Sequence, residues 1–261
     1  MTLPFVSPAG LDPSFTISRP TVADIDALSE VYFQSFATDP GNTYWWSPDR
    51  EAMRDWLRDR IERKMANRSV RHYHVVDNKA KDIVAFARWD IPKGFDAQFG
   101  EWVDSNSALG VSHVAAENNT EEPTATTPTT APVEETEPTV ASTMAGPRGS
   151  DQELCRCFFS ALSSLSKKWN AEEMLGLSLL CTSPKYHRRG AAKALLTPML
   201  AVADTAGLQC YLEATPGGRP VYEKLGFRTV EVKEFDIGAL TSGRMKGLYK
   251  LSIMIREPQK L

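Results

Sequence analysis

The spacing of apolar residues along the N-terminal part of the chain switches between the helical and the strand period. Thr21 stands where a helix cap is expected, and apolar residues then recur at three- and four-residue intervals to about residue 37. A second helix with one apolar face begins at Ser47 and Pro48. The segments with strand-like composition are 15–17, 70–76 and 83–89. The turn at 77–79 joins the last two segments, which predicts a β-hairpin.

The C-terminal part of the chain continues this alternation. The apolar run at 174–181 is long enough for a strand and too short for a helix. Gly226 follows a short helical segment and suits its C-terminal cap. The elements predicted here are helix 151–168, strand 174–181, helix 191–206, strand 208–213, helix 220–225 and strands 227–235 and 247–255. Elements in this order predict a mixed sheet with helices on its faces, in the α/β (α+β) class.

Residues 105–150 differ in composition from the rest of the chain. They are rich in Thr, Pro, Glu and Ala, and 115–150 contain no aromatic residue. Such a segment cannot bury enough apolar surface to offset the entropy of ordering, so we predict a disordered low-complexity insertion. Because the entropy of loop closure grows only logarithmically with loop length, an insertion can interrupt a domain at small cost. We therefore predict a single domain over residues 1–261.

Charge and hydropathy exclude several classes of function. A formal net charge of −3 gives no basic excess for nucleic-acid phosphates. No apolar run approaches the roughly 20 residues of a membrane helix, and the N-terminus does not resemble a signal peptide. The four cysteines lack a zinc-binding spacing, so no metal site is predicted. These features predict a cytoplasmic protein, with the nucleus as the alternative location, that binds neither nucleic acid nor membrane.

One segment of the chain suits an anion. After an apolar strand, the chain passes through Pro184 and a basic loop directly into a helix. The first N–H groups of a helix have no partner within it, and the helix dipole adds partial positive charge. Small residues at 190–192 leave room for a pyrophosphate, and further charge comes from Arg188, Arg189 and Lys193. The segment is neither a Walker A loop nor a dinucleotide fingerprint, and a basic loop before a helix is also common where nothing binds.

The same segment resembles a family motif. Pro184-x-Tyr186-x-Arg188-Arg189-Gly190-x-Ala192 is similar to the acetyl-CoA motif Q/R-x-x-G-x-G/A of the GNAT superfamily of N-acetyltransferases. The composition of the acidic linker at 105–150 and the sequence L-E-A-T-P-x-G at 212–218 are similar to those of fungal members. Further along, the segment from Tyr222 to Phe227 resembles the family's second marker, Y-x-x-x-G-F. The chain departs from the family pattern at His187, where Gln or Arg is usual. An Asn that often contacts the cofactor is also missing, with Thr215 or Gly218 nearby instead.

The resemblance implies a fold and a cofactor site. The expected fold is a mainly antiparallel central sheet of about six or seven strands flanked by helices, whose fourth and fifth strands splay apart around acetyl-CoA. Backbone groups of the fourth strand would pair with the pantetheine arm, and the loop would hold the pyrophosphate. The implied cofactor-binding residues are Leu180, Cys181, Thr182, His187, Arg188, Arg189, Gly190, Ala191, Ala192, Lys193, Thr215 and Gly218.

The resemblance also implies direct transfer of the acetyl group from the thioester to a primary amine. Tyr222 would protonate the leaving thiolate, because a phenol with a pKa of about 10 is still protonated at neutral pH. Its alternative interpretation is a buried core tyrosine. Glu213 ends a strand and is the candidate base if burial raises its pKa. The other candidates are His72 and His74, and all three carry the alternative of a structural or solvated side chain.

The acceptor side is expected at the loop 39–48 and the last hairpin, 237–247. Tyr44, Trp45 and Trp46 are the candidate substrate-binding residues, and these aromatics suit a small or aromatic amine better than a long acidic peptide. They fit a packed loop equally well, so protein or peptide amines stay open. The alternative function is a non-catalytic acyl-CoA-binding regulatory protein of the same fold. The expected partner is a small-molecule or peptide amine acceptor. The protein is expected to be a monomer or a homodimer, in which case a second copy of the chain is also a partner.

Overall fold

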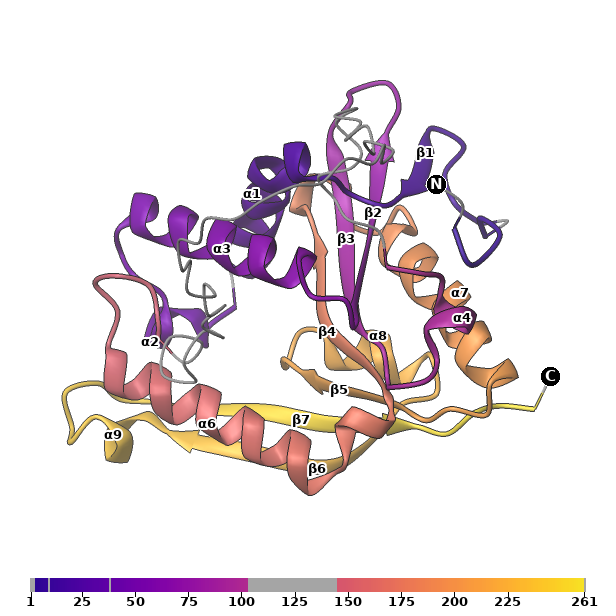
Figure 1. Ribbon diagram of the computed structural model, residues 1–261. Coiled ribbons are helices and arrows are strands. Elements are labelled where there is room, and N and C mark those ends of the chain that lie inside the picture. Colours follow the sequence, from indigo (N-terminus) through magenta and orange to yellow (C-terminus); the bar gives the residue numbers. More distant parts are fainter. Residues whose placement is uncertain (1–2, 9, 38, 103–144, 261) are drawn as a thin grey trace, which may run out of the picture.

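A seven-stranded sheet forms the centre of the protein (Figure 1). The structure is a computed structural model that describes residues 3–8, 10–37, 39–102 and 145–260. The strands are β1 (Phe15–Ser18), β2 (Val70–Asp77), β3 (Ile83–Asp90), β4 (Leu175–Thr182), β5 (Cys210–Ala214), β6 (Arg228–Asp236) and β7 (Leu248–Arg256). Their order across the sheet is β1-β2-β3-β4-β5-β7-β6, and every pair except β4–β5 is antiparallel. The predicted mixed, mainly antiparallel sheet is confirmed.

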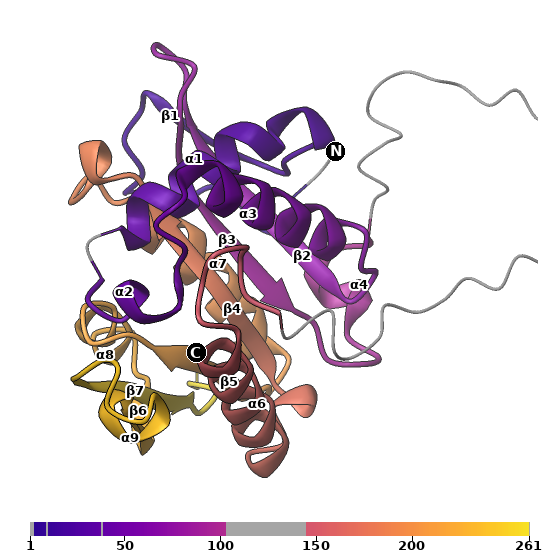
Figure 2. The same ribbon diagram turned by 90° about the vertical axis from the view of Figure 1, so that its left-hand side faces the viewer.

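Helices cover both faces of this sheet (Figures 1 and 2). The long helices are α1 (Ile25–Phe36), α3 (Arg50–Met65), α6 (Gln152–Lys168) and α7 (Ala191–Thr205). The short helices of the described residues are α2 (Asn42–Trp45), α4 (Asp96–Phe99), α8 (Arg219–Glu223) and α9 (Ile237–Leu240). Apolar residues of α1 and α3 pack against β3 and β4 on one face, and α7 packs on the opposite face. Helix α6 covers the part of the sheet that β5, β6 and β7 form.

The two parallel strands β4 and β5 separate soon after they meet. They pair only at Leu175 with Cys210 and at Gly176 with Tyr211. On its other edge β4 is paired with β3 along its whole length, with a bulge where Arg88 lies opposite Leu179 and the next residue opposite Leu177. From Leu177 onward, the edge of β4 that faces β5 therefore has no strand partner. The divergence that the family resemblance implied is present.

The predicted elements agree with the structure to within a few residues, and α2, α4 and α9 are additional. These short helices lie in segments that sequence periodicity treats as loops, because one turn is too short to show a period. No helix in the described part of the chain is long and apolar enough to cross a membrane. The described residues also contain no group of His, Cys, Asp and Glu side chains that could hold a metal ion.

Most of the insertion predicted at 105–150 lies outside the described residues. The chain on either side of it is attached to α3. The indole N–H of Trp102 donates to the carbonyl of Met65 at 3.2 Å, and the indole N–H of Trp56 donates to the carbonyl of Ala145 at 3.0 Å. Residues 145–150 form a turn whose backbone is bonded to the side chain of Gln152. The last part of the predicted insertion therefore packs on the fold.

A buried ion pair joins the end of α7 to the end of β7. Arg256 and Asp204 make two parallel hydrogen bonds of 2.6 and 2.7 Å, and both side chains are at most 9% exposed. The Arg256 Nε also donates to the carbonyl of Leu225 at 2.9 Å. Burial opposes ionisation of Asp204, but its hydrogen bonds to Arg256 and to the N–H of Gln259 outweigh burial and lower its pKa. The pair therefore fixes the C-terminal end of α7 to the sheet.

We predict that Asp204→Ala lowers the free energy of unfolding at pH 7 by about 3 kcal/mol, because it leaves the Arg256 charge buried without a partner. The stabilisation from a lowered carboxyl pKa is present above the unfolded pKa and is lost as pH falls through the folded pKa. Urea unfolding at several pH values measures both effects. The matched control is Glu223→Ala in the exposed Arg219–Glu223 pair, which should change stability by less than about 0.5 kcal/mol. Equal losses in the two variants would contradict the prediction.

Candidate functional site

A single cavity of about 780 Å³ connects the loop before α7 with the space between α3 and α6. It passes through the gap that β4 and β5 leave open, since Leu177, Ser178 and Leu180 line it from one strand and Glu213 from the other. Most residues predicted for the site from the sequence line this one cavity. They are Trp45, Trp46, Leu180, Thr182, His187, Arg188, Gly190, Ala191, Ala192, Lys193, Glu213, Thr215, Gly218 and Tyr222.

Three of the predicted residues do not line the cavity. The side chain of Cys181 is buried in the apolar cluster between the sheet and helices α1 and α3. Tyr44 instead contacts the last hairpin, where its hydroxyl donates to the carbonyl of Lys246 at 3.3 Å. Arg189 points toward the N-terminal segment and the turn between β2 and β3. The prediction that its charge lies beside a pyrophosphate stays a prediction, and other residues of the chain engage its side chain.

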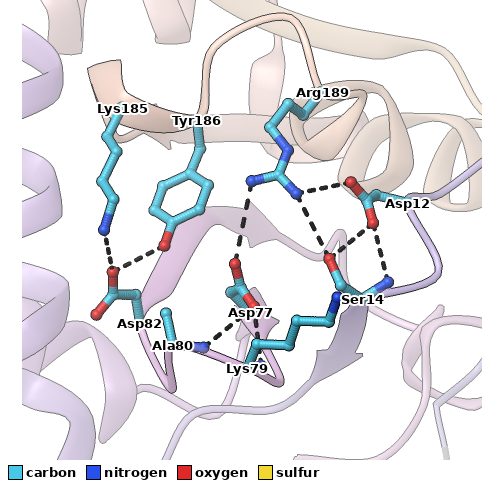
Figure 3. Close-up of polar contacts among 9 residues, drawn as sticks. All are labelled: Asp12, Ser14, Asp77, Lys79, Ala80, Asp82, Lys185, Tyr186 and Arg189. Carbon is cyan, nitrogen blue, oxygen red and sulfur yellow. Dashed lines mark hydrogen bonds and ion pairs between the residues drawn. The ribbon is translucent and has the colours of Figure 1, made fainter.

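Arg189 turns away from the cavity because acidic groups from distant parts of the chain bind it (Figure 3). Its Nη2 lies 2.7 Å from a carboxylate oxygen of Asp12. The guanidinium also lies over the rings of Phe15 and Tyr186, at 4.4 and 5.3 Å from their centroids. Hydrogen bonds from Ser14, together with Arg189, lower the pKa of Asp12 to about 2. The contacts of Arg189 therefore hold the loop rather than a ligand.

A second acidic residue holds the beginning of the same loop. Asp82, at the start of β3, accepts hydrogen bonds from the ammonium of Lys185 at 2.8 Å and from the hydroxyl of Tyr186 at 2.7 Å (Figure 3). His187 closes the other side, where its Nε2–H donates to the carbonyl of Thr182 at 3.1 Å. His187 thus bridges the loop and the end of β4.

The backbone of the loop leaves a row of N–H groups free. Arg188 and Gly190 adopt positive φ angles of 62° and 83°. Helix α7 begins after Gly190, and its first intrahelical bond is from the N–H of Ala194. Within the described residues, no N–H group from Arg188 to Lys193 has a hydrogen-bond partner. A helix start with free N–H groups, small residues and Lys193 fits a pyrophosphate.

Tyr222 presents its hydroxyl to the cavity from α8. The residue is 9% exposed, and its ring packs edge-on against Phe227 with 6.0 Å between centroids. Its hydroxyl makes no hydrogen bond to another described residue, and burial raises the pKa of the phenol. A turn places it there, because the N–H of Gly218 donates to the Thr215 hydroxyl at 3.2 Å. Tyr222 therefore keeps a proton that it can donate into the cavity.

Glu213 is the carboxyl group that faces the gap from β5. Burial raises its pKa, while a hydrogen bond from the Tyr211 hydroxyl at 2.8 Å acts in the opposite direction. The negative charge of Asp90 raises the pKa further. His72 and His74, the alternative bases, are buried on β2 and do not line the cavity. Of the three candidate bases, Glu213 is therefore the one that lines the cavity, and its pKa is raised.

Several residues that line the cavity were not predicted for the site. Trp56 and Arg60 come from α3, Phe158 and Phe159 from α6, and Arg88 from β3. The ring of Phe158 stacks on Trp45 with 4.1 Å between centroids. Sequence periodicity does not single out these aromatics, because an apolar residue on a helix face usually belongs to the core. Arg88 could have been suspected as a lone charge in an otherwise apolar strand.

Comparison with known proteins agrees with this architecture. Residues 166–246 match the model of the acetyltransferase (GNAT) domain family. No curated protein matches the chain. A structure of a histone acetyltransferase HPA2 and related acetyltransferase from Corynebacterium glutamicum is 20% identical, with a TM-score of 0.52, and the match covers 95% of this chain and 98% of that one.

Two insect enzymes have similar structures. Arylalkylamine N-acetyltransferase 2 from Aedes aegypti is 15% identical with a TM-score of 0.53, and the match covers 94% of this chain and 99% of that one. A polyamine N-acetyltransferase from Drosophila melanogaster is 12% identical with a TM-score of 0.53, covering 93% and 99%. At these identities the likeness concerns the fold. The chain thus has the fold of the GNAT acetyltransferases, and its residues 166–246 match their domain.

Proposed function

We propose that the protein is an acetyl-CoA-dependent N-acetyltransferase that passes the acetyl group directly to a primary amine. One observation carries this proposal. A single cavity is lined by the residues of a helix start with free N–H groups, by an acid, Tyr222 on α8, and by a candidate base, Glu213 on β5. A protein that only bound acyl-CoA would have no use for both groups beside the thioester.

The chain's own groups account for binding of the co-substrate. The free N–H groups from Arg188 to Lys193 bind the pyrophosphate, with Lys193 adding charge. The unpaired edge of β4 from Leu177 to Thr182 offers backbone groups to the pantetheine amides. Cys181 contributes through its backbone alone, because its side chain is buried on the other face.

The chemistry requires two proton movements. Bound acetyl-CoA supplies a thioester whose carbonyl carbon forms a bond to the amine nitrogen while its bond to sulfur breaks. Glu213 accepts the proton that the amine loses, directly or through a water, and its raised pKa brings it nearer the pKa that a base needs at neutral pH. Tyr222 gives its proton to the leaving thiolate, and its hydroxyl has no competing partner among the described residues.

Direct transfer fits the structure better than an acyl-enzyme on cysteine. Burial raises the pKa of Cys181 well above its usual value, and its side chain is outside the cavity. A cysteine nucleophile needs the opposite, an accessible thiolate with a lowered pKa. Cys155 is also buried, and burial raises its pKa as well. The amine therefore attacks the thioester itself.

The size and lining of the acceptor end favour a small molecule. Trp45, Trp46 and Trp56 line it together with Phe158 and Phe159. This aromatic wall suits a compact apolar body, and peptide amines are the alternative. The names of the similar insect enzymes, an arylalkylamine and a polyamine N-acetyltransferase, refer to small amines in those proteins.

Three measurements test the function. Calorimetric titration should show saturable binding of acetyl-CoA to the protein. When the protein and acetyl-CoA are mixed with a panel of primary amines, free thiol should be released. A thermal-shift titration should agree, because a ligand that binds the native state raises the unfolding midpoint. Binding without thiol release from any amine would assign the chain to the alternative, a non-catalytic acyl-CoA-binding protein.

We predict that Gly190→Glu abolishes acetyl-CoA binding while the protein stays folded. The added Cβ would meet only the Gly10 carbonyl at 3.5 Å, but the carboxylate would stand beside the pyrophosphate. The matched control is Gly207→Glu at the far end of α7, where φ is also positive at 67° and nothing lies within 4 Å. Calorimetry on both variants separates the effects. Normal affinity in Gly190→Glu, or equal loss in both, would disprove the loop assignment.

We expect Tyr222→Phe to lower kcat by about 10²-fold, the low end for general acids because a thiolate leaves readily. The acetyl-CoA dissociation constant should change little, since the ring still packs on Phe227. Steady-state kinetics and calorimetry measure the two quantities. Full turnover in the variant would show that another group or water donates the proton. If the affinity for acetyl-CoA and kcat both fell strongly, the Tyr222 hydroxyl would be a binding group.

The pH profile should report on Glu213. A base acts only when deprotonated, and the Glu213 pKa is raised, so kcat/KM should rise with pH at values above the ordinary carboxyl range. Glu213→Gln should remove this acidic limb and lower kcat. Tyr211→Phe should move the limb to higher pH, because it removes a hydrogen bond that lowers the pKa of Glu213. An unchanged limb in Glu213→Gln would assign the base elsewhere.

A further inference from the structure

Arg88 on β3 is a guanidinium buried beside the cavity. Only 3% of its surface is exposed, and it lines the cavity at the acceptor end. Its Nε donates to the Ser178 hydroxyl at 2.9 Å, and its Nη2 donates to the Ser178 carbonyl at 3.2 Å. Its Nη1 is buried and has no hydrogen-bond partner among the described residues. Arg88 thus keeps one charged donor without a partner at the wall of the cavity.

Arg60 on α3 brings a second guanidinium to the same end of the cavity. It lies over the rings of Trp56 and Phe159, at 5.0 and 5.1 Å from their centroids. Its Nε is buried and likewise lacks a partner in the part of the chain that the structure describes. Stacking on aromatic rings orients the guanidinium plane and leaves the donors at its edge free to bind.

No carboxylate of the described residues forms an ion pair with Arg60 or Arg88. The nearby Asp90 lies 3.7 Å from the ammonium of Lys64. The acids that line the cavity are engaged elsewhere. Glu213 accepts a hydrogen bond from Tyr211, and Asp39 accepts one from the N–H of Gly41 at 2.8 Å.

The local charge at Arg88 is positive, and the neighbouring histidine neither adds to it nor neutralises it. His72, beside Arg88 on the neighbouring strand, is neutral, because burial and the charges of Arg88 and Lys64 lower its pKa to about 3. Burying a charge without a partner is costly, and the cost is usually offset by pairing. The structure therefore has a place for an anion that the described residues do not supply.

We propose that the acceptor is an amine with a carboxylate on an apolar, aromatic body, and that Arg88 and Arg60 bind this carboxylate. The proposal rests on the N-acetyltransferase function above and adds the substrate class to it. Guanidinium groups match the planar geometry of a carboxylate and form charge-assisted hydrogen bonds with it. The rings of Trp45, Trp56 and Phe158 receive the apolar body.

Arg88 also has a structural role, which the test must separate from binding. Its bonds to Ser178 hold the bulge of β4, opposite which it lies. That role requires hydrogen-bond donors, which a neutral amide also provides. The positive charge and the free Nη1 are not explained by it. Arg88→Gln is therefore the informative variant, since it keeps a donor and removes the charge.

The reaction of such an acceptor balances without a further reactant. The neutral amine nitrogen forms the new bond to the acetyl carbon, the carbon–sulfur bond breaks, and one proton passes from nitrogen to Glu213. The thiolate takes a proton from Tyr222, and the products are an N-acetyl amino acid and free CoA. The acceptor's carboxylate stays ionised throughout, so its contact with Arg88 and Arg60 is present before and after transfer.

Matched acceptors that differ only in the carboxylate test the proposal. The pairs are phenylalanine and phenethylamine, tryptophan and tryptamine, and 4-(aminomethyl)benzoate and benzylamine, which span two amine–carboxylate spacings. Thiol release gives kcat/KM for each, corrected for the fraction of free amine. In at least one pair the carboxylated member should be preferred on the order of 10- to 100-fold, the range for a hydrogen bond to a charged group. Its methyl ester should lose that preference.

Arg88→Gln and Arg60→Gln should each remove most of this preference, because kcat/KM falls far more for the carboxylated member of a pair than for the uncharged amine, and should keep the acetyl-CoA dissociation constant. The control is Arg63→Gln, an exposed arginine of α3 away from the cavity, which should change nothing. If Arg88→Gln does not fold, Arg60→Gln decides, because Arg60 holds no strand. Equal losses for both members of a pair, equal turnover of both members by the native protein, or weaker acetyl-CoA binding would overturn the carboxylate site. Absence of thiol release from every acceptor would instead overturn the N-acetyltransferase function.

Discussion

The short pairing between β4 and β5 is the constraint on which the rest of the site depends. The two strands share only two residue pairs, because parallel neighbours that diverge cannot continue their hydrogen bonds. β4 stays ordered since its other edge is bonded to β3 along its length. The divergence opens the sheet itself, so a ligand can reach from the face that α7 covers to the face that α3 and α6 cover. The helices then supply walls on both sides without having to form a cleft of their own.

The positive charge at the two ends of the cavity comes from different chemical groups. At the loop end, positive potential comes from backbone N–H groups and from the solvated Lys193, which can relax around a flexible, highly charged ligand. At the other end Arg88 is buried and held against a strand bulge, and the half-buried Arg60 lies against the rings of Trp56 and Phe159. Water screens charges less in such surroundings, so a rigid and compact anion gains most there.

The elements of the fold could be read from sequence because their periods are strong. The run at 174–181 and the hairpin of β2 and β3 agree within a residue or two with the structure. The loop from His187 to Lys193 was found through a local motif. The direction of Arg189 could not be found in this way, because its partner Asp12 is 177 residues away and only the fold brings them together. The position of Phe158 at the cavity could not be predicted, because an apolar side chain on a helix has the same sequence pattern whether it faces a core or a cavity.

Helix α3 is where the chain departs before residue 103 and returns after residue 144. Trp102 is bonded at its end, at Met65, and Ala145 at its middle, at Trp56. These two attachment points are nine residues apart on one rigid helix, which is about 13 Å along its axis. The intervening chain can therefore change in length without altering the strand order or the distance between its own ends. The point of return at Ala145 is coupled to the cavity, because the indole of Trp56 that bonds to it also lines the acceptor end. A shift of the backbone at Ala145 would therefore move this wall through a single hydrogen bond.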